Sequence, residues 1–352
     1  MRLFVWAMLV AGLQSTPMRI RSLLATLLFA AISLAQSTFT NPVLDHGPDP
    51  WVIRYKGSYF YMNTTGKDLQ IRKTADTAAL DKAAPVVVWT PEPGHEWSKE
   101  LWAPELHRWG NKWYIYFAAD AGKNEGHRIY VVENPSDDPT QGTWTLKGKV
   151  ADSTDKWAID ASVFEHHGQH YIIWSGWQGD HDGEQDIFIA HMSSPWTIDS
   201  PRTLIGKPTY EWELHGDLPG RHVSVNEGPE FLPHGDKVFV TFSANGCWTD
   251  FYSLGELEAK TNANLLDAKS WTKIDHPFFT TDASAHAYSP GHNGFFNAPN
   301  GQNWIVYHAN PEPGQGCGNH RSPRIQPFTW SADGTPNFGK PAPINEPMTS
   351  PR

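Results

Sequence analysis

The chain has 352 residues, of which 19% are charged, and its formal net charge is −10. This acidic balance argues against nucleic acid or an anionic membrane as a partner. Aromatic residues make up 13% of the chain, which also contains 29 Gly and 28 Pro. Such a composition is typical of short strands, many turns and a surface that binds flat, apolar-faced groups such as sugar rings.

The first 35 residues have the pattern of a secretory signal peptide. Arg19 and Arg21 give a positively charged start, residues 23–34 form an apolar run too short to span a bilayer, and Ala35 ends a small-residue cleavage pattern. Translation starting at Met18 is an alternative to Met1, and an N-terminal anchor is the less favoured reading. We therefore expect a secreted protein in which residues 36–352 form a single domain.

Five segments of the remaining chain repeat one pattern of a polar residue, a short apolar strand, a glycine-containing turn and a strongly aromatic strand. They are residues 49–61, 102–116, 160–174, 227–241 and 293–307, with turn glycines at 57, 110, 168, 235 and 301. Each segment reads as a β-hairpin. Five copies of a four-stranded unit predict an all-β fold, a five-bladed β-propeller, in preference to a β-sandwich of unrelated hairpins.

Eight residues before these glycines lie Asp49, Trp102, Asp160, Glu227 and Asn293. Equivalent positions on the innermost strands of a propeller face the same end of its channel, so we expect these side chains to converge on one site. Three carboxylates in one site repel one another, and at least one pKa must rise. That cost indicates a functional role, with turn capping as the alternative.

This set contains the groups that cleavage of a glycosidic bond requires. One protonated carboxyl must give a proton to the leaving oxygen, and one ionised carboxylate must activate water or attack the sugar. A third acid near the proton donor raises the donor's pKa by repulsion. Trp102 offers a wall on which a sugar could stack. The residues by themselves do not say which acid has which role.

The motifs that open the repeats resemble those of glycoside hydrolase family 43, whose members are five-bladed propeller arabinofuranosidases, xylosidases and arabinanases. The matching segments are residues 47–50 (Gly-Pro-Asp-Pro), 102–105 (Trp-Ala-Pro-Glu), 159–164 (Ile-Asp-Ala-Ser-Val-Phe) and 226–229 (Asn-Glu-Gly-Pro). The similarity extends from about residue 41 to residue 343. Ala161 departs from the family pattern, which usually has Pro after this Asp.

The resemblance implies a role for each carboxylate. Asp49 matches the general base, Glu227 the general acid, and Asp160 the third carboxylate, which tunes the acid's pKa and orients it. Family members invert the anomeric carbon, which requires the base and the acid to lie roughly 6.5–9.5 Å apart.

Further residues are implied to bind substrate or a metal ion. His292 resembles a histidine near a calcium or sodium ion on the propeller axis, which it would meet through water because calcium prefers oxygen ligands; a buried, hydrogen-bonded histidine is the alternative. Arg324 resembles an arginine that reaches into the pocket from the closing segment, and a surface arginine is the alternative. The chemistry itself needs no cofactor.

Three segments look most like family members that act on α-L-arabinofuranosides: residues 174–177, 243–248 and 308–314. We expect release of terminal α-L-arabinofuranose from arabinan or arabinoxylan, by a monomer with a plant polysaccharide as its partner. β-Xylosidase or endo-arabinanase activity is the near alternative. A non-catalytic polysaccharide-binding propeller and a retaining fructosidase-like enzyme are more distant ones.

Smaller features stay open at this level. Cys247 and Cys317 are the only two cysteines, and the sequence does not decide whether they pair. Asn63-Thr64-Thr65 is a glycosylation sequon that could instead line the pocket. Trp177 and Trp248 could wall the site, although core packing is the favoured interpretation for both.

Overall fold

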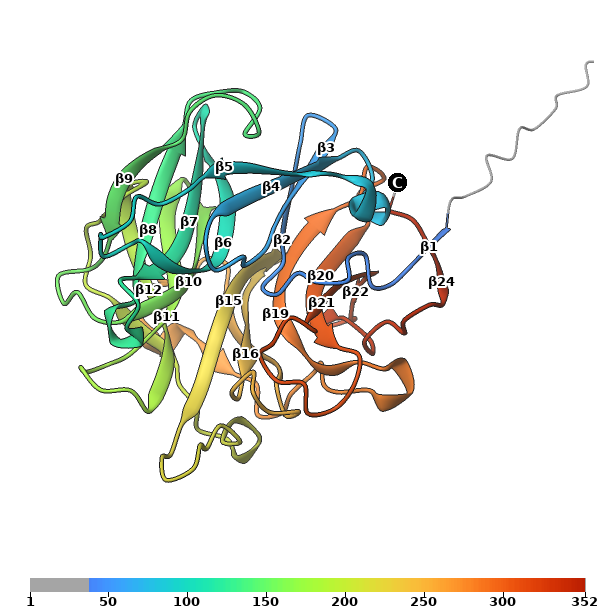
Figure 1. Cartoon of the computed structure of the whole chain (residues 1–352). Coiled ribbons are helices and arrows are strands. Elements are labelled where there is room, and N and C mark those ends of the chain that lie inside the picture. Colours follow the sequence, from blue (N-terminus) through green and yellow to red (C-terminus); the bar gives the residue numbers. More distant parts are fainter. Residues whose placement is uncertain (1–37, 352) are drawn as a thin grey trace, which may run out of the picture. The chain divides into compact units, whose positions relative to one another are not determined.

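The computed structural model describes residues 38–351, and the predicted signal peptide, residues 1–35, lies outside them. The described residues belong to one compact unit, whose regular secondary structure consists almost entirely of strands (Figure 1). The helices of the described part are short 3₁₀ turns: η1 (Thr77–Lys82), η2 (Asn124–Gly126), η3 (Glu211–Glu213), η4 (Ala268–Ser270) and η5 (Ala283–Ala285). Among these residues no helix is long and apolar enough to cross a membrane.

The strands form five groups in chain order, each antiparallel within itself, and a short parallel pairing joins the third group to the fourth. The first two are β2 (Trp51–Tyr55), β3 (Ser58–Met62), β4 (Leu69–Thr74) and β5 (Pro85–Trp89), then β6 (Lys99–Trp109), β7 (Lys112–Asp120), β8 (Arg128–Asn134) and β9 (Thr145–Val150). The third is β10 (Ala158–His166), β11 (Gln169–Gly176) and β12 (Glu184–Ser194), on which β13 (Thr197–Ile198) and β14 (Thr203–Gly206) pair. The fourth is β15 (Ser224–His234), β16 (Lys237–Ala244), β17 (Ser253–Lys260) and β18 (Thr272–Lys273), and the fifth is β19 (Tyr288–Asn297), β20 (Asn303–Asn310) and β21 (Ser322–Pro327).

Buried apolar side chains join these groups in a ring. One cluster packs the first group on the second, and others pack the second on the third, the third on the fourth and the fourth on the fifth. A further cluster, which includes Val52, Tyr59, Phe296 and Trp304, packs the fifth group back on the first. The predicted all-β propeller is therefore confirmed, and burial of these apolar faces is its main source of stability.

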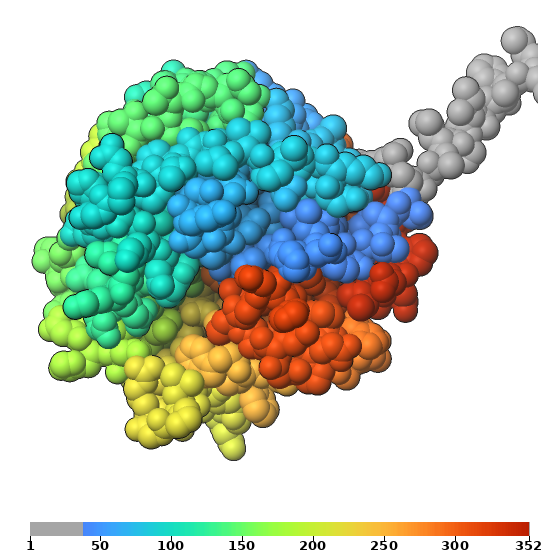
Figure 2. Space-filling view, in the orientation of Figure 1, coloured from blue at the N-terminus to red at the C-terminus, as the bar shows by residue number. Residues whose placement is uncertain are grey.

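The two ends of the ring are held together by pairing between distant segments. β1 (Thr38–Thr40) pairs with β24 (Pro347–Thr349). Near the C-terminal end, β22 (Thr329–Trp330) pairs locally with β23 (Pro336–Asn337). The Asn41 side chain donates to Ile325 O and accepts from Ile325 N, both at 2.9 Å. Figure 2 shows the start of the described chain, in blue, against its end, in red. These contacts tie the start of the described chain to β21 of the fifth group and to the C-terminal segment.

The five predicted hairpins are β2–β3, β6–β7, β10–β11, β15–β16 and β19–β20. Their turn glycines do not occupy equivalent places. Gly57 and Gly168 are the second turn residue and follow Lys56 and His167, which also have positive φ, whereas Gly110 comes first in its turn. Both arrangements suit the twist of a two-residue hairpin, as type I′ and type II′ turns.

Because the glycine stands first in some turns and second in others, aligning the five hairpins on their glycines displaces some inner strands by one residue. Counted back from the end of the inner strand, Asp49 and Asp160 match Ala103 and Gly228, and all four have φ between 42° and 57°. Glu227 precedes this position by one residue, as does Trp102. The three carboxylates therefore do not share one structural position, because a glycine can serve in either half of a two-residue turn.

Candidate active site

A local backbone irregularity, the β-bulge, recurs in the first strand of several groups and turns its side chains toward the channel. In β6, β10, β15 and β19 two residues oppose one residue of the neighbouring strand, which is a β-bulge. The first residue of each bulge has positive φ: Ala103, Asp160, Gly228 and His292. Each bulge bends its strand and turns side chains toward the channel mouth. The sequence shows no signal for these bulges beyond the repeat itself.

The side chains meet in a pocket of about 370 Å³. Its lining includes Asp49, Asp160, Glu227, Trp102 and His292. The structure thus brings together every predicted site residue except Arg324. Asn293, which the glycine register had aimed at the same site, is buried beside it and accepts a hydrogen bond from Thr241 Oγ1 instead.

Asp49 is held as a carboxylate. Arg321 Nη1 donates to its Oδ1 at 2.8 Å, and Thr64 Oγ1 donates to its Oδ2 at 2.6 Å. Burial alone would raise the pKa of Asp49, but the charge of Arg321, the neighbouring His292 and His308 rings and the Thr64 hydroxyl together outweigh it, so this pKa lies well below its ordinary value. Burial also keeps the pKa of His292 and of His308 low, so these rings are neutral and Arg321 supplies the positive charge.

Glu227 has the opposite character. Burial raises its pKa to about 7, the negative charge of Asp49 adds to this, and the Tyr252 hydroxyl, which donates to Oε1 at 2.8 Å, opposes it. Near neutral pH a substantial fraction of Glu227 therefore carries a proton. A carboxyl in this state can donate that proton, which Asp49 cannot.

Asp160 is coupled to Glu227. Its Oδ2 accepts from Gly228 N at 3.0 Å, and ligand atoms of Asp160, Glu227 and His292 lie within 4.8 Å of one another. Burial, with repulsion from Glu227 and Asp49, raises the pKa of Asp160 well above its ordinary value. Two carboxyls this close do not both ionise readily, so the pair retains a proton near neutrality.

Beneath the pocket the axis holds a further acidic pair that the sequence patterns did not reveal. Glu105 and Glu230 are both nearly fully buried, and burial together with Glu105 raises the pKa of Glu230 well above its ordinary value. His107 Nε2 lies 2.7 Å from Glu105, and Ser162 Oγ donates to Glu230 at 3.4 Å. The raised pKa of Glu230 favours its protonated form. The negative charge near the channel axis is thus limited by protonation, as well as by the positive charge of Arg321.

The structure corrects the prediction for Arg324. Its side chain is fully buried and donates to the carbonyl oxygens of Ala285, Ala342 and His286. It joins the loop before β19 to the C-terminal segment and does not line the pocket. Arg321, three residues earlier, does line it and binds Asp49. The sequence offered two arginines in one short segment, and only the path of the strand decides which one points inward.

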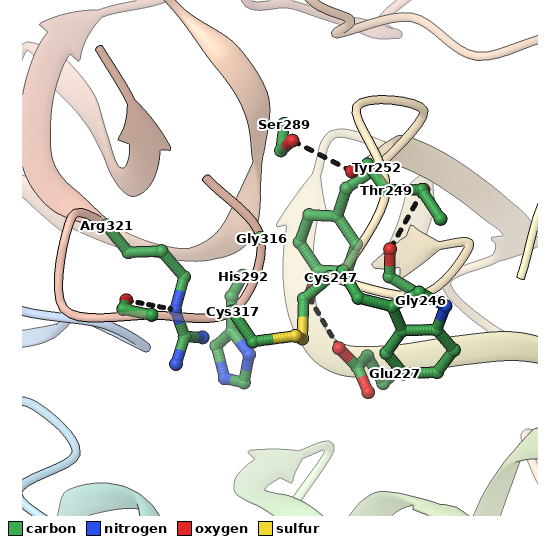
Figure 3. The surroundings of a disulfide bond; sticks show 12 residues. Glu227, Gly246, Cys247, Thr249, Tyr252, Ser289, His292, Gly316, Cys317 and Arg321 are labelled. Atoms are coloured by element: carbon green, nitrogen blue, oxygen red, sulfur yellow. Dashed lines mark hydrogen bonds between the residues drawn. A yellow bond between two sulfur atoms is a disulfide. The ribbon is translucent and has the colours of Figure 1, made fainter. Parts of the chain in front are cut away.

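Three indole rings form much of the pocket wall: Trp102, Trp157 and Trp248. Trp177 is buried and stacks on Trp157 with ring centroids 4.7 Å apart, so it supports the wall from behind. Trp248 follows Cys247, which forms a disulfide with Cys317. This bond lies beside Glu227, His292 and Arg321 (Figure 3), and both of its cysteines line the pocket.

Sequence reasoning missed three residues that contact the carboxylates: Arg321, Tyr252 and Thr64. Thr64 had a partial signal, because the sequon that contains it ends the first hairpin. Its Oγ1 also accepts from Ala103 N at 2.7 Å, which ties the first group to the second. Tyr252 and Arg321 follow irregular loops, where no strand period predicts which way a side chain points.

The family model described as "Glycosyl hydrolases family 43" matches residues 39–336. A protein of Streptomyces avermitilis named extracellular exo-alpha-(1->5)-L-arabinofuranosidase is 35% identical over 313 residues, 86% of this chain and 64% of that protein. Its namesake in Streptomyces chartreusis is 35% identical over 277 residues, covering 77% and 82%. The crystal structure of an alpha-L-arabinofuranosidase from Lactobacillus brevis has a TM-score of 0.81 at 34% identity, covering 88% of this chain and 98% of that one. This chain thus spans slightly less than two thirds of the Streptomyces avermitilis protein.

Replacing Arg321 with Met should raise the pKa of Asp49, because the buried carboxylate loses the positive charge that stabilises it. Carboxyl NMR titration of the ¹³C-labelled protein measures this directly. Arg321→Lys keeps a charge but not the planar donor group, so it should give a smaller rise. An Asp49 pKa that is the same in Arg321→Met and in the wild type would contradict the assigned cause.

Replacing both Cys247 and Cys317 with Ser should lower the free energy of unfolding by about 2–4 kcal/mol, because the bond closes a long loop in the unfolded chain. Urea denaturation of the variant and of the oxidised wild type measures the loss, with reduced wild type as the matched control. Equal midpoints for oxidised wild type and variant would argue that the bond adds no stability.

Proposed function

Because this chain belongs to glycosyl hydrolase family 43, we propose that it is a secreted, inverting glycosidase that releases terminal α-L-arabinofuranosyl residues from arabinan or arabinoxylan. The observation that carries this proposal is the opposite protonation of two carboxyls in one pocket. Asp49 is kept ionised by Arg321, and Glu227 has a pKa of about 7. Inverting hydrolysis requires such a pair of one base and one acid.

The reaction that we propose proceeds in one displacement. Asp49 accepts a proton from a water molecule as the water oxygen bonds to the anomeric carbon. The bond from that carbon to the leaving oxygen breaks, and Glu227 gives its proton to that oxygen. Asp160, whose Oδ2 accepts from Gly228 N, helps to orient the chain next to Glu227, and its closeness to Glu227 favours the state in which this pair retains a proton.

The choice of sugar rests on the likeness to named arabinofuranosidases. The two Streptomyces proteins carry an exo-acting name, and a pocket walled by Trp102, Trp157 and Trp248 suits the end of a chain better than its middle. β-Xylosidase or endo-arabinanase activity is the alternative, since loops at the mouth decide between pocket and groove. Secretion, the monomeric state and a plant polysaccharide as partner belong to the same proposal.

An ion on the axis near His292 stays part of the proposal as a structural element only. Asp160, Glu227 and His292 could each offer one ligand atom. Direct binding by all three would compete with the proton that the two carboxyls retain. A calcium or sodium ion would therefore meet His292 through water, and it takes no part in the bond-breaking step.

The anomer released first tests the proposal. Proton NMR during hydrolysis of an α-L-arabinofuranoside should show β-arabinofuranose before mutarotation, because water attacks from the face opposite the leaving group. Initial α-arabinofuranose would mean retention and would remove Asp49 from the role of base. Failure to cleave arabinofuranosides while β-xylosides are cleaved would favour the xylosidase alternative.

Glu227→Ala should lose about 10²–10⁴-fold in kcat on arabino-oligosaccharides and far less on aryl arabinofuranosides, whose leaving group needs no proton. Asp49→Ala should lose activity on both substrates, because every substrate needs the activated water. Steady-state kinetics on the two substrate types measures this contrast.

The exposed Glu165 provides a matched control: Glu165→Ala removes a carboxylate of the same type outside the pocket and should leave both rates unchanged. Equal losses on both substrates in Glu227→Ala would contradict its assignment as the acid.

A further inference from the structure

A second cluster of metal-ligating side chains lies behind the aromatic wall of the pocket. Glu100 on β6, Asp120 at the end of β7 and His127 just before β8 each offer one ligand atom, and these atoms lie within 4.8 Å of one another. Asp120 and His127 are fully buried, whereas Glu100 is exposed. The cluster therefore has one side that is open to solvent.

Both ring nitrogens of His127 face oxygen atoms. Nε2 lies 3.3 Å from Glu100 O, and Nδ1 lies 3.2 Å from Asn124 O and 3.4 Å from Asp120 Oδ2. The ring is therefore fixed with Nδ1 turned toward the Asp120 carboxylate, and these two atoms face each other inside the cluster.

Asp120 supplies an independent observation. Its Oδ1 accepts from Gly122 N at 2.6 Å, which fixes the carboxylate plane. Its Oδ2 is buried and has no hydrogen-bond partner among the residues that the structure describes. Lys99 packs against Gly122, but in the described part the ion pair of Asp120 is with His127. A buried carboxylate oxygen without a donor is costly unless a cation neutralises it.

We propose that Glu100, Asp120 and His127 bind one divalent transition-metal cation such as Zn²⁺ or Mn²⁺. Two carboxylates and one imidazole suit these ions, whereas calcium prefers a shell made of oxygen alone. The bond from His127 Nε2 to a backbone carbonyl and the bond from Gly122 N to Asp120 are the outer contacts that usually orient metal ligands.

The site would brace the pocket wall. The Trp102 ring stacks on His127 with centroids 3.9 Å apart, and Trp157 Nε1 donates to Asn124 O at 2.8 Å. Both indoles line the pocket. An ion that fixes His127 and the turn at Asn124 would therefore hold two of the three stacking surfaces in place, without touching the bond that is cleaved.

The test uses the full chain treated with a chelator and then titrated with ZnCl₂ or MnCl₂. We expect one equivalent of metal to remain bound after gel filtration. We also expect a rise in Tm of about 3–5 °C at a metal concentration one hundred times Kd. Calcium should bind more weakly. A wild type that retains no zinc or manganese would overturn the proposal and leave the contact between His127 Nδ1 and Asp120 Oδ2 as the explanation of the cluster.

Variants assign the binding to this cluster. Glu100→Gln, an exposed change that should fold normally, and Asp120→Asn should each weaken metal affinity at least about tenfold. Glu125→Gln makes the same charge change on the neighbouring exposed turn η2 and should bind like the wild type. His292→Gln should also keep the ion, which separates this site from the axis. Equal metal affinity in Glu100→Gln, Asp120→Asn and the wild type would contradict the proposal.

Because metal content and Tm are read without substrate, this result stands apart from the proposed glycosidase activity. Loss of activity with normal metal binding would count against the function alone. Normal activity with no metal bound would count against the metal site alone.

Discussion

The constraint on which this site depends is that three carboxyls crowded into one pocket cannot all carry charge. The protein provides one guanidinium, Arg321, and places it on Asp49. Asp160 and Glu227 receive only a backbone N–H and a tyrosine hydroxyl, which do not outweigh the effect of burial, so their pKa values rise. One cation next to one carboxyl thus separates a carboxylate from a pair of carboxyls that retains a proton.

The ring supports this arrangement by bringing residues from opposite ends of the chain together. Asp49 precedes the first hairpin, Glu227 lies in the fourth group, and Arg321 precedes the last strand of the fifth. The closure that pairs β1 with β24 and ties Asn41 to Ile325 therefore also sets the distance between Arg321 and Asp49. Stability of the closure and protonation of the site are linked, because separation of the ends would leave Asp49 buried without its partner.

Backbone strain is concentrated where side chains must point inward. Asp49, Ala103, Asp160 and His292 are non-glycine residues with positive φ, each of which costs roughly 1–2 kcal/mol. At the fourth equivalent position Gly228 is required for a second reason. A Cβ there would lie 3.1–3.3 Å from the His292 ring. Backbone strain at these positions of the ring thus accompanies the convergence of polar side chains around one axis.

The sequence by itself determined the repeat, the all-β fold, the family and the convergence of Asp49, Asp160, Glu227, Trp102 and His292, because these follow from local patterns of strand and turn residues. It could not fix the finer register, since a turn glycine can stand first or second in a hairpin and shifts the count by one. Tertiary structure alone decided that Arg321 rather than Arg324 faces Asp49, that Tyr252 and Thr64 complete the site, and that Cys247 pairs with Cys317. Except for Arg324, which lies in β21, those residues lie in loops, where the direction of a side chain is set by long-range packing and not by any period in the chain.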